Sequence, residues 1–598
     1  MCGITACVGD ERAVSTLLSG LDNLEYRGYD SAGIAVPNGR SLDVVKRSGA
    51  VADLVESVRR ERPDGRIGIG HTRWSTHGAP TDENAHPHTD CTGTVAVVHN
   101  GIIENYAALR DRLQASGHEI DSETDTEVLP HLVEERLDAG AEPEAALRSV
   151  LDEIEGSYAI AMVVAGSDTV YAARNGSPLV IGLGEETNYL ASDVPAFIEH
   201  TDRVVYLDDG DVAVIGAESY RVTDWDGRDC DRPVRTVDWT AADAEKGRHD
   251  HYMHKEIHEQ PRALRQALQG RLDDGVSLDD LDGGVVEDVE RVQFVACGTS
   301  YHAGLYGAQL LRERDVPAVT CLASEYVTAA PPETDGTLVI GVTQSGETAD
   351  TLEALRTARS CGHRTLAVTN TVGSTAAREC GEALFVRAGP EIGVAATKTF
   401  SSQIVTLGLL AEWIAARHGA DRGEAFHAAL AGLPEIVQSV VESADARAVA
   451  RQFRDSDAYF FIGRSTGYPV ALEGALKLKE ISYEHAEGFA AGELKHGPLA
   501  LVTDRTPVFA IDTGRNTETL LGNVEEVRAR GAPVVAVGPP ESPIAALADA
   551  VLPVPSTDPE LTGIGANVQL QLLAYHVAAA LDRPIDKPRN LAKSVTVE

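Results

Sequence analysis

Lysine is scarce in this 598-residue chain, which has nine lysines against 43 arginines and 92 acidic residues. The formal net charge is −40 at pH 7, so the chain lacks the cationic surface with which proteins bind nucleic acids or anionic membranes. We expect neither partner. Acidic self-repulsion is weakest where salt screens it, over a Debye length of about 3 Å at 1 M. The composition therefore predicts a halophilic protein.

Paired-cysteine motifs and long apolar runs are also missing. None of the eight cysteines forms a Cys-x-x-Cys pair, so neither a disulfide framework nor a zinc site is predicted. No apolar run approaches the roughly 18 residues of a membrane span, and no charged-then-apolar leader precedes Cys2. We therefore expect a cytoplasmic protein without a bound metal. The cysteines stand at positions 2, 7, 91, 230, 297, 321, 361 and 380.

The length predicts several domains. The first, at 2–225, alternates short strand-like runs with a few helices, and the acidic, aperiodic segment 226–250 is typical of a linker. The strands expected in the first domain are Ile4–Val8, Gly33–Val36, Ile67–Gly70, Thr94–His99, Tyr158–Val164 and Thr169–Ala172, and the expected helices include Val14–Leu24 and Asn105–Ser116.

A repeat follows the linker. The runs 294–300 and 459–465 are both apolar strands that end in a turn of Gly and a hydroxyl residue. Two further matches, 339–348 with 508–517 and 365–368 with 534–537, have nearly the same spacing of about 170 residues. Because all-apolar strands alternate with helices, we predict an α/β protein with two doubly wound parallel sheets. The predicted modules are 285–425 and 450–588.

Chemistry in the first domain begins at Cys2. If Met1 is trimmed, one residue holds both a thiol and a free α-amine, which titrates near ~7.7–8.0 and can take the thiol's proton. Nucleophile and base then lie in one residue. The alternative is an ordinary small apolar residue or a frayed end.

Three polar stretches accompany Cys2. His71–Gly78 combines an arginine, an indole, two imidazoles and hydroxyls, and Asn100-Gly101 follows an apolar strand. Thr124–Glu127 adds a carboxylate. An arginine for an α-carboxylate, an aspartate for an α-ammonium and two donors for an oxyanion together fit an amide-bearing amino acid. Each signal alone is weak, since Asn-Gly is usually only a turn.

These stretches, with Tyr26–Ser31, resemble the glutaminase domain of the N-terminal-nucleophile (Ntn) amidotransferases, which implies an Ntn-hydrolase αββα sandwich. By this resemblance Cys2 attacks the glutamine carboxamide, and Asn100 with Gly101 forms the oxyanion hole. His86 and Arg27 have a supporting part. The glutamine-binding residues that the resemblance implies are Arg73 and Asp125, which grip the amino-acid head group, Trp74, which gates the site, and Thr76 and His77, which line it.

Hydroxyl-rich turns follow two strands of the repeated half. The turn 343–348 stands between a strand and a helix, where unpaired N–H groups favour an anion. Such turns usually only cap helices. A second turn of this kind at 297–300 favours the interpretation that the two turns together form a phosphosugar-binding site.

The densest charged stretch lies near the second repeat. Glu473, Lys477, Glu480 and Glu484 stand at i, i+4, i+7 and i+11, on one stripe of an expected helix. On a solvated face they would only form weak ion pairs. However, three of the nine lysines lie between 477 and 495, in a chain that otherwise uses arginine. An amine that must form a Schiff base cannot be replaced by a guanidinium.

The repeated half, with 391–395 and the tail 589–598, resembles the sugar-isomerase (SIS) modules of the glutamine–fructose-6-phosphate aminotransferase (isomerizing) family, and the similarity covers essentially the whole chain. It implies synthesis of glucosamine 6-phosphate from glutamine and fructose 6-phosphate without a cofactor, in a homodimer. This chain departs from the family pattern at two positions, since Thr343 and Ala396 stand where family members commonly have serine. The implied catalytic residues are Glu480 (proton transfer), His496 (ring opening, from a neighbouring subunit) and Lys593 (imine), and the sugar-phosphate ligands are Thr299, Ser300, Thr343, Gln344, Ser345, Thr348, Val394, Glu473 and Lys477.

The alternative function is that of a related deglycase or isomerase, or of an amidotransferase for a different phosphosugar. A regulator that senses sugar phosphates is a further class. It would have a DNA-binding front half and no helix-borne set of Glu and Lys, and the sequence shows neither feature.

Overall fold

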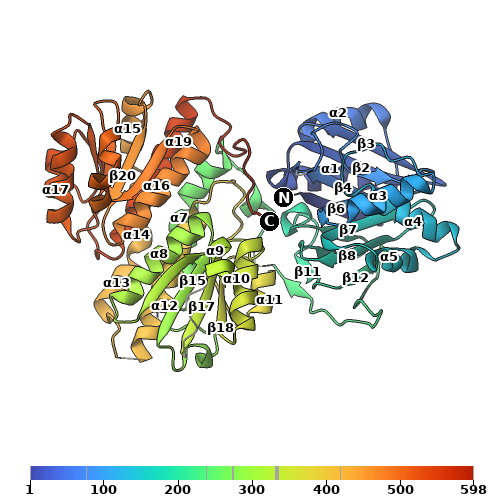
Figure 1. Cartoon of the computed structure of the whole chain (residues 1–598), viewed down its shortest axis with the longest axis horizontal. Helices are drawn as coiled ribbons and strands as arrows, with labels where there is room; N and C mark the ends of the chain where they lie inside the picture. Colours follow the sequence, from blue (N-terminus) through green and yellow to red (C-terminus); the bar gives the residue numbers. More distant parts are fainter. Residues whose placement is uncertain are drawn as a thin grey trace. The chain divides into compact units, whose positions relative to one another are not determined.

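The computed structural model describes residues 2–75, 77–237, 239–272, 275–329, 336–417 and 419–596. The chain divides into two compact units (Figure 1). The first is Met1–Ala244 together with Ala592–Glu598, and the second is Glu245–Leu591. In the part of the chain described, no helix is both long and apolar enough to cross a bilayer.

The first unit contains an eight-stranded and a six-stranded antiparallel sheet. The strand orders are β14-β11-β9-β10-β1-β4-β2-β3 and β13-β12-β8-β7-β6-β5. The eight-stranded sheet consists of β1 (Gly3–Val8), β2 (Ser31–Asn38), β3 (Ser41–Ser48), β4 (Ile67–Arg73), β9 (Val180–Leu183), β10 (Asn188–Ala191), β11 (Arg203–Tyr206) and β14 (Arg235–Thr236). The six-stranded sheet consists of β5 (His88–Thr89), β6 (Val95–Ile103), β7 (Gly156–Val164), β8 (Val170–Asn175), β12 (Val212–Ile215) and β13 (Tyr220–Thr223).

The two sheets pack face to face, because alternate side chains of their strands are apolar. Ile4 and Ala6 of β1 lie in one buried cluster with Ala159 and Ala161 of β7. Helices α1 (Ala13–Leu24) and α2 (Val51–Glu61) pack against strands of the eight-stranded sheet, while α4 (Val128–Asp138) and α5 (Pro143–Leu151) pack on the six-stranded sheet, with α3 (Tyr106–Ala115) against α4. This confirms the predicted αββα sandwich.

The segment 226–250, which the sequence predicts to be a linker, contains two short elements. They are β14, an edge strand paired with β11, and helix α6 (Ala241–Ala244). The division between the units falls at Ala244.

The second unit contains two five-stranded parallel sheets. Their strand orders are β16-β15-β17-β18-β19 and β21-β20-β22-β23-β24. The first consists of β15 (Arg291–Ala296), β16 (Ala318–Leu322), β17 (Thr337–Thr343), β18 (Arg364–Thr369) and β19 (Ala383–Phe385). The second consists of β20 (Tyr459–Gly463), β21 (Ala486–Ala490), β22 (Val508–Ile511), β23 (Val534–Gly538) and β24 (Ala550–Pro553).

Helices cover both faces of each sheet, as the all-apolar strands require. In the first module α8 (Gly298–Arg312) and α12 (Lys398–Arg417) pack on one face, while α9 (Ala323–Ala329), α10 (Ala349–Ser360) and α11 (Thr375–Glu379) lie on the other (Figure 1). In the second module α16 (Gly467–Ser482) and α19 (Thr562–Ala580) pack on one face, and α17 (Thr517–Arg528) and α18 (Pro543–Leu547) on the other. The predicted duplication is confirmed.

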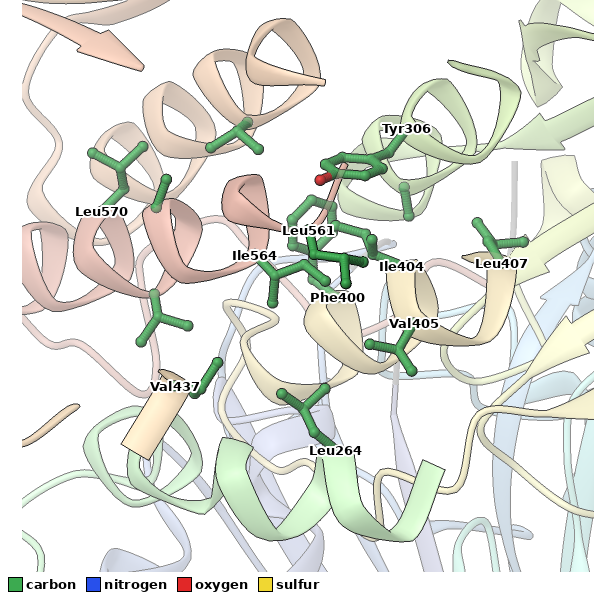
Figure 2. Close-up of a cluster of buried hydrophobic side chains, with 14 of the residues drawn as sticks. Leu264, Tyr306, Phe400, Ile404, Val405, Leu407, Val437, Leu561, Ile564 and Leu570 are labelled. Carbon is green, nitrogen blue, oxygen red and sulfur yellow. The ribbon is translucent and has the colours of Figure 1, made fainter. Parts of the chain in front are cut away.

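One hydrophobic core joins the two modules (Figure 2). Its side chains include Leu264 of α7 (Tyr252–Leu268), Tyr306 of α8 and Phe400 of α12, together with Val437 of α14 (Leu433–Val441). The Tyr306 hydroxyl donates to the Glu560 carbonyl oxygen at 2.5 Å. Among the described residues of this unit, the remaining α-helices are α13 (Glu424–Ala431) and α15 (Asp445–Phe453).

Candidate functional site

Cys2 lies directly before β1, an interior strand of the eight-stranded sheet. Its half-buried thiol faces the backbone of Trp74, whose N–H donates to Sγ at 3.3 Å. Gly28 makes this close packing feasible, since a Cβ there would lie 2.7 Å from the Trp74 nitrogen. The sulfur is therefore held against a backbone donor at the end of a buried strand.

Asn100 connects Cys2 to both sheets. Its side-chain amide donates to the Cys2 carbonyl oxygen at 3.0 Å and to Ser192 Oγ at 2.8 Å. Its own oxygen lies 3.0 Å from His71 Nε2, on β4. Ser192 in turn accepts the Ile4 N–H at 2.8 Å. Neighbouring Gly101 has φ +125°, and a Cβ there would lie 2.0 Å from the Ser157 carbonyl oxygen, so the strand requires glycine.

Arg73 and Asp125 are both buried. The Arg73 guanidinium donates to Ser75 Oγ at 3.2 Å and also to the carbonyl oxygens of residues 77 to 79. Burial lowers the pKa of Arg73, although the nearby Asp30 and Asp125 carboxylates act in the opposite direction. Asp125 accepts the Ile103 N–H at 2.8 Å. The predicted pair thus lies within electrostatic range.

Trp74, the predicted gate, and His77, a predicted lining residue, follow β4. The Trp74 ring meets Tyr29 edge to face with centroids 5.6 Å apart, and His77 meets Tyr106 at 5.9 Å. Thr76, also predicted to line the site, lies outside the described residues.

Buried histidines form a row behind Cys2. The rings of His71 and His86 are stacked at 4.2 Å, and His88 meets His86 at 4.8 Å. Burial lowers the pKa of His71 to about 3, and it lowers that of His86 well below its ordinary value, where the neighbouring histidines and Arg73 add to the effect. The imidazoles are therefore neutral at physiological pH.

In the second unit the turn after β17 shapes a loop of hydroxyls and N–H groups. Thr343 is buried, and its Oγ1 accepts the Gly346 N–H at 3.2 Å and lies 3.1 Å from Thr348 Oγ1. Ser345 Oγ accepts the Glu347 N–H at 3.1 Å. Helix α10 begins directly after Thr348. Gln344, Ser345 and Thr348 are partly exposed, as a phosphate-binding loop requires.

The second turn contacts a buried charged group on α16. Thr299 Oγ1 donates to Glu473 Oε1 at 3.0 Å and receives a bond from Lys477 Nζ at 3.1 Å. Lys477 also lies 2.6 Å from Glu480. Burial alone would lower the pKa of Lys477, but the Glu480 and Glu473 carboxylates outweigh it and raise that pKa. Lys477 is therefore a fixed ammonium and not a proton donor at neutral pH.

Other predicted sugar-site residues have different surroundings. Buried Ser300 accepts a bond from Gln403 Nε2 at 3.0 Å, and Val394 is partly exposed. His496 ends the short helix η4 (Ala491–His496) and is exposed. Lys593 belongs to the segment Ala592–Glu598, which is grouped with the first unit. Helix α16 ends at Ser482, so Glu484 does not continue the predicted stripe.

The structure adds residues that the sequence patterns did not identify. His302 Nδ1 lies 2.8 Å from Glu473 Oε2. Ser192 joins β1 to Asn100, and Asp193 pairs with Arg27 at 3.1 Å. Arg27 Nε donates to the Cys2 carbonyl oxygen at 3.3 Å. Ser192 and Asp193 belong to no sequence motif. The only signal in the sequence that could have indicated them is their position directly after a strand.

Two family models match the chain. The SIS domain matches residues 286–412 and 452–581, and the glutamine amidotransferase domain matches residues 71–199. Together they lie on the two units described above.

Curated relatives match the chain from end to end. Glutamine–fructose-6-phosphate aminotransferase (isomerizing) of Halobacterium salinarum is 54% identical, and that of Thermus thermophilus 47%, with 100% of both chains covered in each comparison. Among solved structures, the C-terminal domain of the Francisella tularensis glucosamine-fructose-6-phosphate aminotransferase is 34% identical with a TM-score of 0.55, covering 57% of this chain and 99% of that one.

The row of neutral histidines predicts a specific loss of stability in acid. A histidine with a lowered folded pKa stabilises the fold above its unfolded pKa near 6.5, and this contribution is lost as the pH falls below that value. In the variant His86→Phe the ring stack is retained and one site of proton uptake is removed. We expect the free energy of unfolding of the variant to fall less steeply below pH 6.5, by up to about 1.4 kcal/mol per pH unit. Denaturant unfolding from pH 7.5 to 5 measures this, and equal slopes for the two proteins would contradict it.

Proposed function

The chain belongs to the family of glutamine–fructose-6-phosphate aminotransferases (isomerizing), and from this premise we propose which residues carry each half of the reaction. The enzyme hydrolyses glutamine and transfers the ammonia to fructose 6-phosphate, giving glutamate and glucosamine 6-phosphate. The observation that carries this function is the match of both halves, in order, to relatives with that activity in their name. A deglycase, an isomerase or a regulator is set aside for the same reason.

We assign the first half-reaction to Cys2. Once Met1 is removed, the α-amine takes the thiol proton, and the thiolate attacks the glutamine carboxamide. The tetrahedral oxyanion is stabilised by the Gly101 N–H and by the Asn100 amide, which exchanges its bond to the Cys2 carbonyl for one to the oxyanion. Ammonia leaves, and water hydrolyses the thioester to glutamate. Arg73 and Asp125 hold the substrate's α-carboxylate and α-ammonium groups, with Trp74, Thr76 and His77 around them.

We assign the second half-reaction to Lys593 and Glu480. Lys593 forms an imine with open-chain fructose 6-phosphate, and ammonia displaces the lysine. Glu480 then moves a proton from C1 to C2, which converts the ketose imine into the amino aldose. The fixed Lys477 ammonium, 2.6 Å from Glu480, stabilises the ionised carboxylate that accepts this proton.

The phosphate binds in the loop of the first module. Thr343, Gln344, Ser345 and Thr348 supply hydroxyls and N–H groups at the N-terminus of α10. Thr299, Ser300, Val394, Glu473 and Lys477 bind or orient the rest of the sugar, and His496 assists ring opening. Thr343 keeps the hydroxyl of the usual serine but uses it to hold the turn.

We propose that this enzyme works in a cytoplasm of high ionic strength. None of the eight cysteines forms a disulfide, which fits a reducing compartment. The surplus of 92 acidic over 52 basic residues fits high salt. Assays therefore belong in a high-salt buffer.

The assignment of Cys2 predicts a separation of the two half-reactions. In Cys2→Ala we expect glutamine-dependent synthesis of glucosamine 6-phosphate to fall at least about 10³-fold, because the nucleophile is lost. Synthesis from added ammonia should continue, because the sugar chemistry uses other residues. Product assays with glutamine and with ammonium salts measure both, and Cys361→Ala, at an exposed cysteine, is the control. Loss of the ammonia reaction in Cys2→Ala, or survival of the glutamine reaction, would contradict the assignment.

The assignment of Lys593 predicts a covalent adduct. Borohydride reduction in the presence of fructose 6-phosphate should leave a sugar on Lys593, detected by peptide mass spectrometry. Lys593→Arg should give no adduct, since a guanidinium does not form the imine. Lys479→Arg, at an exposed lysine of α16, should behave like the wild type. An adduct on another lysine of an active enzyme rules the assignment out.

A homodimer completes the proposal, since exposed His496 acts on the sugar of a neighbouring subunit. His496→Ala and Lys593→Arg homodimers should both be inactive. In a mixed dimer one site has both intact residues, so a statistical mixture should recover about a quarter of wild-type activity. An inactive mixture with proven subunit exchange, or an active monomer in sedimentation, would refute a shared site.

A further inference from the structure

Four side chains that the reaction does not use converge in the first unit. Cys91 follows β5, His118 follows α3, and His131 and Glu134 stand one turn apart on α4. One potential ligand atom from each lies within 4.8 Å of all the others. Cys91 is exposed, His118 is partly exposed, and the other two are buried.

Four of the six distances between these atoms match the edges of a tetrahedron around a metal ion, and the other two lie within 4.8 Å. Cys91 Sγ lies 3.5 Å from Nδ1 of His118 and 3.5 Å from Nδ1 of His131. Glu134 Oε2 lies 3.2 Å from Nδ1 of His118 and 3.4 Å from Nδ1 of His131. Zinc bonds of about 2.3 Å to sulfur and about 2.0–2.1 Å to nitrogen or oxygen give tetrahedral edges of about 3.5 Å for S···N and about 3.3 Å for N···O.

A bound metal ion explains the convergence of these four side chains better than hydrogen bonds among them do. Both ring nitrogens face the same sulfur and the same carboxylate oxygen, and a single N–H proton can point at only one of them. One cation at the centre satisfies all four ligand atoms. Supporting contacts are also present, because the Cys91 N–H donates to Glu134 Oε2 at 3.2 Å and His118 Nε2 lies 3.7 Å from a Glu135 carboxylate oxygen.

The turn that bears Cys91 is held independently of any metal. Asp90 Oδ1 accepts the N–H groups of Thr94 and Val95, both at 2.7 Å. At the second segment, the His118 N–H donates to the Leu113 carbonyl oxygen at 3.1 Å and so fixes the exit from α3. The ligand-bearing backbones are thus preorganised.

We propose that Cys91, His118, His131 and Glu134 bind a zinc ion. Four protein ligands close the coordination shell, so the site is structural and has no open position for catalysis. Binding releases the Cys91 thiol proton to solvent. The sequence predicted no zinc site because the chain has no Cys-x-x-Cys pair. The proposed ligands instead come from three separate segments, whose spacing matches no known zinc motif.

The position of the site connects it to glutamine binding. The two histidines bracket residues 119–130, which include Asp125 and its neighbours Thr124 to Glu127. Thr124 Oγ1 lies 3.0 Å from His88 Nε2, and the Ser122 N–H donates to the Glu127 carboxylate at 2.6 Å. A metal that ties both ends of this segment reduces its freedom in the unliganded enzyme. Stripping the metal should raise the KM for glutamine and leave ammonia-driven synthesis unchanged.

Metal analysis of the full-length, untagged enzyme tests the proposal. After dialysis against metal-free buffer we expect about one tightly bound zinc per chain. Replacement by Co²⁺ should give the near-ultraviolet charge-transfer band of a thiolate ligand and the visible bands of tetrahedral cobalt. Cys91→Ser should abolish the charge-transfer band, and His131→Ala should weaken zinc binding by more than about 100-fold in chelator competition.

The control is His254→Ala, which removes a member of the three-histidine cluster His249, His254 and His258 in the second unit. That cluster has no sulfur, so the variant should keep both the thiolate band and the zinc held at Cys91. Should a variant fail to fold, the wild-type cobalt spectrum still decides. A wild type that gives no thiolate band after its zinc has been removed and cobalt added, or a Cys91→Ser protein that retains the band, would overturn the proposal.

Discussion

The bond from the Asn100 side-chain amide to the Cys2 carbonyl oxygen fixes Cys2 between the two sheets of the first unit. It joins Cys2, directly before β1 in one sheet, to β6 in the other, and His71 and Ser192 complete the network. Such a bond contributes only about 0.5–1.5 kcal/mol net, but a buried partner left unpaired costs about 1–3 kcal/mol. The network therefore fixes position more than it adds stability, and a thiol at a chain end requires that.

Fixed charge serves the same purpose in the second unit. Glu473 and Lys477 are almost completely buried beside the Thr299 turn, where apolar side chains would serve stability at least as well. Loss of one member would leave an unpaired buried charge, at a cost of about 3–5 kcal/mol. We attribute the retention of this pair to the sugar chemistry proposed for it. Here the lysine keeps its proton and faces Glu480, the carboxylate to which we assign the proton transfer.

Periodicity and motif spacing predicted most of the fold. The expected strand Ile4–Val8 is β1 at Gly3–Val8, and the expected helix Val14–Leu24 is α1 at Ala13–Leu24. The duplication followed from apolar runs that parallel sheets must bury on both faces. The charged stripe was wrong at Glu484, because Tyr483 adopts a left-handed conformation and ends α16. Helical periodicity does not reveal a cap of that kind.

The sites were predicted only as far as local motifs extend. Asn100 and Arg73 stand in recognisable stretches, whereas Ser192 and His302 act through contacts made by distant segments. The group around Cys91 is the clearest case, since its proposed ligands are spread over residues 91 to 134. Long-range packing brings such residues together, and no spacing in the sequence encodes it.

The central claim is that Cys2, with its own freed amine, is the nucleophile. Acid quenching of a single turnover with glutamine, followed by peptide mass spectrometry, tests it most directly. The account predicts a γ-glutamyl thioester on an N-terminal peptide that begins at Cys2. An active enzyme that retains Met1, or a γ-glutamyl group on any other residue, would contradict it.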